Sequence, residues 1–202
     1  MGIQKTIMKK IKKALISVSD KKNLKNILKA LTKHKIDLIS SGGTYKEIKR
    51  LKFKCLEVSE YTNFTEILGG RVKTLHPKIH AGILSKRSNK SHKNNIDKNN
   101  FKEIDLVIVN FYPFEKTIKE TNNHLKIIEN IDVGGPTMVR AAAKNYNDVT
   151  VITSSNQYDE LIKEIEKCKG STSLEFREKM SLEAFSETAY YDAVISNYFN
   201  KI

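Results

Sequence analysis

The sequence predicts an α/β domain with a mainly parallel sheet of about five strands and flanking helices. Short apolar runs alternate along the chain with segments in which apolar residues recur at helical spacing. This order favours parallel strands joined by right-handed crossovers. In addition, 202 residues with 39% hydrophobic content are enough for one sizeable core of the α/β kind. We therefore expect a single α/β domain.

The first half of the chain contains two strand-helix units followed by a third strand. The apolar run Ala14–Val18 ends in Ser19 and Asp20, a pair suited to cap the helix that follows. The second run leads into the polar glycine turn Ser40–Thr44. The elements predicted in this half are strands at 14–18, 36–39 and 55–58 and helices at 24–31 and 45–51.

The second half contains the most apolar strand candidate, Leu106–Phe111, which we expect near the centre of the sheet. The other predicted elements are a strand at 149–153 and helices at 136–144, 158–167 and within 174–199. The C-terminal helical segment shows an apolar stripe with aromatic residues beside it, which we expect to serve packing. This stripe comprises Leu182, Phe185, Ala189 and Ala193, flanked by Tyr190, Val194 and Tyr198.

Two segments lack the pattern of a packed element. Ser85–Asn100 is rich in lysine and asparagine and has no periodic apolar face, so we expect an exposed, mobile loop. Residues 1–13 contain several lysines and no acidic residue, and we expect a largely disordered basic leader. The predicted domain therefore covers residues 14–202.

The composition argues against several function classes. The formal charge of +13 invites a nucleic-acid interpretation, but the lysines are scattered and no basic patch is interleaved with aromatic residues. No apolar run approaches the roughly 20 residues that span a bilayer, and no secretory signal is evident. Cys55 and Cys168 lack the spacing of a metal site or disulfide framework. We expect a cytoplasmic protein without a metal, a membrane or a specific nucleic-acid partner.

Two polar turns fall at the carboxyl edge of the predicted sheet, where open α/β folds bind ligands. Ser19, Asp20 and Lys21 follow the first strand, and the Ser40–Thr44 turn follows the second. Glycine lets the backbone approach an anion, and the N-terminus of the following helix favours negative charge. Each turn alone is equally well explained as an ordinary helix cap. Two such turns on one edge favour an anion site.

A further candidate is the segment Gly69–Pro77, which places two cations, a hydroxyl and a glycine pair within a few residues. Such a density of anion-binding and proton-transfer groups indicates a site for a phosphorylated substrate. Alternatively, the glycines form a turn, the cations are solvated, and His76 before proline marks extended chain. Asn110 and Tyr112 leave the 106–111 strand at the same edge and offer an amide and a phenol.

Taken in order, the segments SVSDK, SSGGT, GGRVKTLHP, NFYPF and IDVGGPTMVRAAAKN resemble the inosine monophosphate (IMP) cyclohydrolase domain of bifunctional purine biosynthesis proteins. The likeness runs from about Ala14 to Phe199. It implies a methylglyoxal-synthase-like, three-layer α/β fold. It also implies a hydrolase-class enzyme that closes 5-formamido-imidazole-4-carboxamide ribotide (FAICAR) to IMP with loss of water, without a metal or organic cofactor. In that family a transformylase domain follows; because this sequence stops at Ile202, we expect no transformylase activity.

The resemblance also implies site residues. Lys73, Tyr112, Asp132 and Lys144 match the catalytic positions of the family, and His76 is expected to support the loop. The positions that match substrate-binding residues are Ser19, Asp20, Lys21, Ser41, Gly42, Gly43, Thr44, Arg71, Val72, Thr74, Val109, Asn110, Val133 and Gly134. Relatives assemble as homodimers largely through the second domain, so a monomer and a homodimer are both open for this chain.

Three other functions compete with this hypothesis. A methylglyoxal synthase would share the fold but gives no reason for NFYPF or RVKTLHP. A non-catalytic nucleotide sensor of the same fold would use Lys73, Tyr112, Asp132 and Lys144 for binding only. A nucleic-acid binder would show steep salt dependence, which scattered lysines do not favour.

Overall fold

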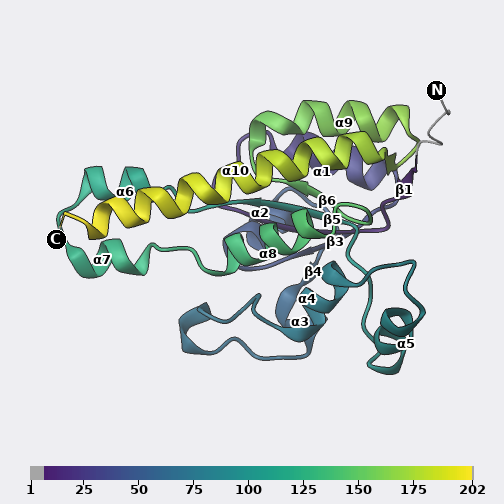
Figure 1. The fold of residues 1–202 in the computed structure, drawn as a ribbon, viewed down its shortest axis with the longest axis horizontal. Coiled ribbons are helices and arrows are strands. Elements are labelled where there is room, and N and C mark those ends of the chain that lie inside the picture. The colour runs from purple at the N-terminus through teal and green to yellow at the C-terminus, as the bar shows by residue number, and fades with distance from the viewer. Residues whose placement is uncertain (1–6, 202) are drawn as a thin grey trace.

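In the computed structural model, which describes residues 7–201, five parallel strands form the central sheet (Figure 1). Across the sheet, the order is β4 (Leu56–Glu57), β3 (Asp37–Ser40), β2 (Lys13–Val18), β5 (Leu106–Asn110) and β6 (Thr150–Ile152). The parallel α/β prediction is therefore confirmed, and every predicted strand is present with its ends within about two residues. The middle strand is β2, with β5 beside it, rather than the more apolar β5.

The sheet is buried on both faces by helices, which makes three layers. Helices α1 (Leu24–Lys33) and α9 (Tyr158–Lys167) contact each other over one face, while α4 (Pro77–Leu84) and α8 (Gly134–Lys144) contact each other over the other (Figure 1). Because helices cover both faces, the interior strands are apolar throughout, as in Leu106–Val109. The long helix α10 (Leu174–Phe199) contacts β6 and α8.

The remaining helices are short. They are α2 (Gly42–Arg50), α3 (Val58–Thr62), α5 (Lys90–Lys98), α6 (Phe114–Glu120) and α7 (His124–Glu129), with 3-10 turns at Leu68–Gly70 and Ser155–Gln157. A separate antiparallel pair joins β1 (Lys9–Lys10) to β7 (Ser171–Thr172). Sequence periodicity missed α3 to α7, since each is too short or too polar to show a clear apolar face.

The prediction that Ser85–Asn100 is a mobile loop was wrong over its central part. Helix α5 occupies residues 90–98, and the side chain of Asn89 caps it by accepting a hydrogen bond from the His92 amide at 3.1 Å. Ile96 is the buried residue of this helix. One buried side chain and a capping asparagine therefore suffice here, although the composition is that of a loop.

The N-terminal prediction was wrong from Lys9 to Lys13. Ile11 is only 2% exposed and belongs to the core, and β1 pairs with β7. Two of the lysines that suggested disorder have partners: Lys9 forms an ion pair with Asp148 at 2.6 Å, and Lys10 donates to the Lys169 carbonyl at 2.6 Å. Residues 1–6 of the predicted leader lie outside the described residues.

The predicted stripe on the C-terminal helix was also wrong. The segment forms one helix, and Leu182 on it is 70% exposed, with Phe185 and Tyr190 also exposed. The buried face is shifted around the helix axis and comprises Phe176, Arg177, Met180, Ser181, Ala184, Thr188 and Tyr191. Because this face includes an arginine, a serine and a threonine, apolar periodicity alone selected the wrong side.

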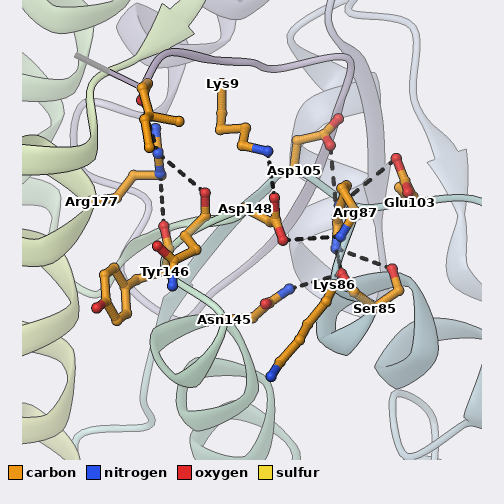
Figure 2. Close-up of polar contacts among 12 residues, drawn as sticks. Lys9, Ser85, Lys86, Arg87, Glu103, Asp105, Asn145, Tyr146, Asp148 and Arg177 are labelled. Carbon is orange, nitrogen blue, oxygen red and sulfur yellow. Dashed lines mark hydrogen bonds and ion pairs between the residues drawn. The ribbon is translucent and has the colours of Figure 1, made fainter. Parts of the chain in front are cut away.

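Arg177 lies at the amino edge of the sheet and is 0% exposed (Figure 2). Its guanidinium donates to the carbonyls of Tyr146 at 2.7 Å, Asn147 at 3.2 Å and Ile7 at 3.1 Å, and also to Thr172. Burial lowers its pKa, and the nearby charge of Asp148 opposes that shift. One side chain therefore joins the N-terminal segment, the turn before β6 and β7 to α10.

We expect Arg177→Ala to lower the free energy of unfolding by about 3 kcal/mol, because several buried carbonyls lose their donor at once. The control is Lys179→Ala on the same helix, which removes an exposed ion pair with Glu160 and should cost less than about 1 kcal/mol. Urea denaturation followed by circular dichroism measures both. Equal losses for the two variants would contradict this account.

Candidate functional site

The turns after β2 and β5 are joined by the side chain of Asn110. Its carboxamide oxygen accepts hydrogen bonds from the Ser19 amide at 2.7 Å, the Ser19 hydroxyl at 2.9 Å and the Asp20 amide at 3.0 Å. Its amide nitrogen donates to the Asp20 carbonyl at 3.2 Å. Asn110 therefore holds the two strand ends together, and its oxygen is already occupied by the protein.

The N-terminus of α2 lies at the same edge. Gly42 has φ +54, a left-handed conformation that favours glycine, and no side chain caps the helix at Ser41. Thr44 is turned inward, where its hydroxyl accepts from the Val18 amide and donates to the Val18 carbonyl, both at 2.9 Å. The backbone amides at the start of α2 thus have no side-chain acceptor at the N-cap and carry the positive end of the helix dipole.

Two ammonium groups flank this helix end. A Cβ atom built on Gly42 would lie 3.3 Å from Lys73 Nζ, and one built on Gly43 would lie 3.9 Å from Lys21 Nζ. Lys21 also contacts the Ser19 carbonyl at 3.4 Å. Two cations and a helix N-terminus around a glycine pair form a site suited to a phosphate group.

The 71–74 segment connects this anion site to the start of α8. Arg71 pairs with Glu129, with Nε 3.2 Å from the carboxylate, and the side chain of Lys73 reaches Gly42. Thr74 is buried against Gly134, where a built Cβ would lie 2.6 Å from the Thr74 hydroxyl. His76 caps α4, accepting from the Lys78 amide at 3.1 Å, which is the supporting role expected from the sequence.

Asp132 lies beside the turn that carries Tyr112. Burial raises the pKa of the Asp132 carboxyl, while hydrogen bonds from the backbone amides of Gly135, at 2.8 Å, and of Tyr112 partly offset that effect. The hydroxyl of Tyr191 accepts from the Asp132 amide at 2.9 Å. The structure therefore places a carboxyl of raised pKa next to the backbone of Tyr112, whose side chain is exposed.

A cleft of about 410 Å³ opens beside these residues between the ends of β2, β5 and β6 and the α10 helix. Its lining includes Ser19, Asp20, Asn110, Tyr112, Ser154, Glu187 and Tyr190. This volume is in the range of pockets that hold small-molecule ligands. The sequence did not single out Tyr191, Glu187 or Glu66, because each belongs to an otherwise ordinary helix or loop pattern.

The predicted valines and Lys144 differ in how they are placed relative to this edge. The Val109 side chain is 1% exposed and belongs to the core, the Val133 side chain is exposed, and Val72 is partly buried near Lys73. Lys144 is the last residue of α8 and is exposed. At 1.5 Å per residue it lies about 15 Å along the helix from Gly134. The structure therefore brings Lys73, Tyr112 and Asp132 to one edge and leaves Lys144 at the opposite end of α8.

Within residues 7–201, no group of three His, Cys, Asp or Glu side chains is arranged to hold a metal ion. In the same residues, no helix combines the length and apolarity needed to cross a bilayer.

Two family models match the chain. The model described as "MGS-like domain" matches residues 23–137, and the model described as "AICARFT/IMPCHase bienzyme" matches residues 142–202. The first covers more than half of the chain and includes the glycine turn, the 69–77 segment and Asp132. The chain therefore belongs to the family of MGS-like domains.

Among curated proteins, the chain is similar to proteins named "Bifunctional purine biosynthesis protein PurH". It is 52% identical over 192 residues to the one from Lactobacillus acidophilus, covering 95% of this chain and 37% of that protein. It is 46% identical over 193 residues to the one from Bradyrhizobium diazoefficiens, covering 96% of this chain and 36% of that protein. The chain thus spans little more than a third of the length of these relatives.

Among solved structures, the chain is similar to one titled "Crystal structure of ForH". The two superpose with a TM-score of 0.82 at 28% sequence identity, covering 94% of this chain and 99% of that one. The likeness therefore extends over nearly the entire fold.

We expect Asp132→Asn to be more stable than the wild type at neutral pH. A raised pKa means that the wild-type carboxyl favours the fold below its usual pKa of 3.8, and that this contribution is lost as pH rises through the folded-state pKa. Asparagine does not titrate, so the stability difference should grow with pH.

Melting temperatures of both proteins between pH 3 and 8 measure this difference, with Asp97→Asn on the exposed face of α5 as control. A difference that is independent of pH would contradict burial as the cause of the shift.

Proposed function

We propose that this chain is an IMP cyclohydrolase domain that closes FAICAR to inosine monophosphate. The observation that carries the proposal is the arrangement at the carboxyl edge, where a two-lysine anion site lies one short segment away from the Asp132 carboxyl and Tyr112. The similarity to bifunctional purine biosynthesis proteins over 95% of the chain supports it. Because those relatives are much longer, this assignment concerns the domain alone.

The substrate phosphate would bind at the start of α2. The amides of Gly42 and Gly43 donate to it, and Lys21 and Lys73 neutralise its charge. Ser19 and Asp20 lie next to this position and line the 410 Å³ cleft. The cleft would hold the imidazole carboxamide beyond the ribose.

Ring closure joins two groups of one molecule. The carboxamide nitrogen attacks the formyl carbon, the carbonyl π bond opens, and negative charge develops on the formyl oxygen. The attacking carboxamide nitrogen loses one proton and the formamide nitrogen loses a second, and the formyl oxygen takes up two protons and leaves as water. The C=N bond forms between the former formyl carbon and the formamide nitrogen. Since the attack is intramolecular, holding both groups at contact distance supplies much of the acceleration.

Three residues are assigned to charge and protons. Lys73 neutralises charge on the substrate phosphate at the start of α2, where its ammonium lies beside Gly42. Asp132 exchanges a proton with the reacting groups, for which a raised pKa is favourable because both protonation states become accessible nearer neutral pH. Tyr112, with an exposed phenol at the cleft, completes the proton path.

Lys144 occupies a different place in this proposal. Its position matches a catalytic position of the family, yet it lies at the far end of α8 from Asp132. A direct role would require movement of α8 or a contribution from another chain. We therefore assign no proton-transfer step to Lys144.

The proposal includes the remaining expectations for the domain. FAICAR and IMP are its small-molecule partners, no metal or organic cofactor takes part, and the cytoplasm is its compartment. The chain acts as a monomer or a homodimer.

We expect Lys73→Ala to lower kcat/KM for cyclisation by about 100-fold, because it removes one of the two cations that hold the substrate phosphate. Lys144→Ala should lose distinctly less, since Lys144 stands about 15 Å along α8 from Gly134. The growth of hypoxanthine absorbance from FAICAR measures both rates, with IMP identified by mass.

Other outcomes separate the rival functions. Production of methylglyoxal from dihydroxyacetone phosphate would identify a methylglyoxal synthase. Tight IMP binding without cyclisation by the wild type would identify a nucleotide sensor, and either result would overturn the proposal.

A further inference from the structure

The ammonium of Lys73 is already paired with a carboxylate of this chain. Lys73 Nζ lies 2.6 Å from Glu66 Oε2, and the other Glu66 oxygen would lie 2.8 Å from a Cβ atom built on Gly70. The same Lys73 Nζ would lie 3.3 Å from a Cβ atom on Gly42. Glu66 therefore reaches the lysine that flanks the N-terminus of α2, and it carries the kind of charge that the site is suited to bind.

The hollow beside this ion pair is small. Between the 63–70 segment and the α2 turn it measures only about 10 Å³, enough for about one water molecule. It is lined by Ser41, Glu57, Ser59, Phe64, Thr65, Glu66, Ile67, Val72 and Lys73. Glu66 and Lys73 both line this hollow, which has no room for a phosphate group while the two side chains are paired.

The segment that carries Glu66 is suited to move. Its side chains from Asn63 to Leu68 are exposed, including the apolar Phe64, Ile67 and Leu68. Asn63, Leu68, Gly69 and Gly70 all have positive φ, and the only regular structure is a single 3-10 turn. Segments with few buried contacts open at low free-energy cost.

The ion pair itself is also inexpensive to break. The side chains of Lys73 and Glu66 are 23% and 44% exposed, and pairs of such exposure contribute at most about 1 kcal/mol. A phosphate monoester carries more charge than one carboxylate and has more oxygens to accept hydrogen bonds from Lys73, Lys21 and the α2 amides. Replacing Glu66 by a phosphate monoester as the partner of Lys73 is therefore favourable.

We propose that Glu66 competes with the substrate phosphate for Lys73. In the ligand-free protein Glu66 forms an ion pair with Lys73, and the 63–70 segment moves Glu66 away from Lys73 when a nucleoside monophosphate binds. This inference rests on the proposed nucleotide site. In this role Glu66 lowers the affinity for the nucleotide. A fixed partner that positions Lys73 would instead raise that affinity.

The test is the affinity of Glu66→Gln for inosine monophosphate, measured by isothermal titration calorimetry. We expect binding about 5-fold tighter than in the wild type, which is the loss of an ion pair worth about 1 kcal/mol. Inosine, which lacks the phosphate, should bind both proteins equally. Glu60→Gln removes a negative charge from the exposed surface of nearby α3 and should leave the affinity unchanged.

A double-mutant cycle locates the effect. In a Lys73→Met background, Glu66→Gln should no longer change the affinity for inosine monophosphate, because the competition for Lys73 has been removed. Equal tightening in both backgrounds would indicate a general electrostatic effect and overturn the proposal.

Two further results would also overturn it: weaker binding by Glu66→Gln, which would make Glu66 a fixed positioning residue, and no detectable nucleotide binding by wild type and variant alike. Cyclisation by the wild type is measured separately. If the wild type cyclises FAICAR but Glu66→Gln does not bind inosine monophosphate more tightly, only this inference is rejected. If Glu66→Gln binds more tightly in a manner that depends on Lys73 but the wild type does not cyclise FAICAR, only the proposed function is rejected.

Discussion

The site depends on one side chain that joins two parallel strands where they end. Val18 and Asn110 are directly opposite in the β2–β5 register, so the chain leaves both strands at the same point. The Asn110 carboxamide then fixes the Ser19–Asp20 turn through four hydrogen bonds. Because the turns after β2 and β5 are held in this way, Lys21 reaches the α2 turn and the backbone amide of Tyr112 meets the Asp132 carboxyl.

The two edges of the sheet serve different purposes. At the amino edge, Arg177 joins four separate segments, and Arg87 forms ion pairs with Glu103 and Asp105 (Figure 2). Arg87 also donates to the carbonyls of Gly82 and Ile104. At the carboxyl edge, the charged pair of Lys73 and Glu66 is partly exposed, and Asp132 is held where burial opposes its ionisation. The two arginines at the amino edge thus stabilise the fold. At the carboxyl edge, the burial of Asp132 lowers stability, and the ion pair of Lys73 and Glu66 can exchange partners.

The sequence was a good guide to the strands and the main helices, because their apolar periodicity reflects burial on both sides of a parallel sheet. It also indicated the polar turns at the carboxyl edge. It did not indicate α5, whose stability depends on Ile96 and an asparagine cap, or the buried face of α10, which includes Arg177. Glu66 has no local signature, because its role arises from contact with Lys73 across a loop. Conversely, Lys144 stands in a recognisable motif, but helix geometry places it far from Asp132.

The central claim is that the carboxyl edge binds a nucleotide by its phosphate. A crystal structure of the complex with inosine monophosphate tests it most directly. The account predicts the phosphate on the amides of Gly42 and Gly43, with Lys21 and Lys73 within about 3 Å of its oxygens, and the base in the cleft beside Tyr112 and Asp132. A phosphate bound elsewhere, or a base directed away from Asp132, would contradict it.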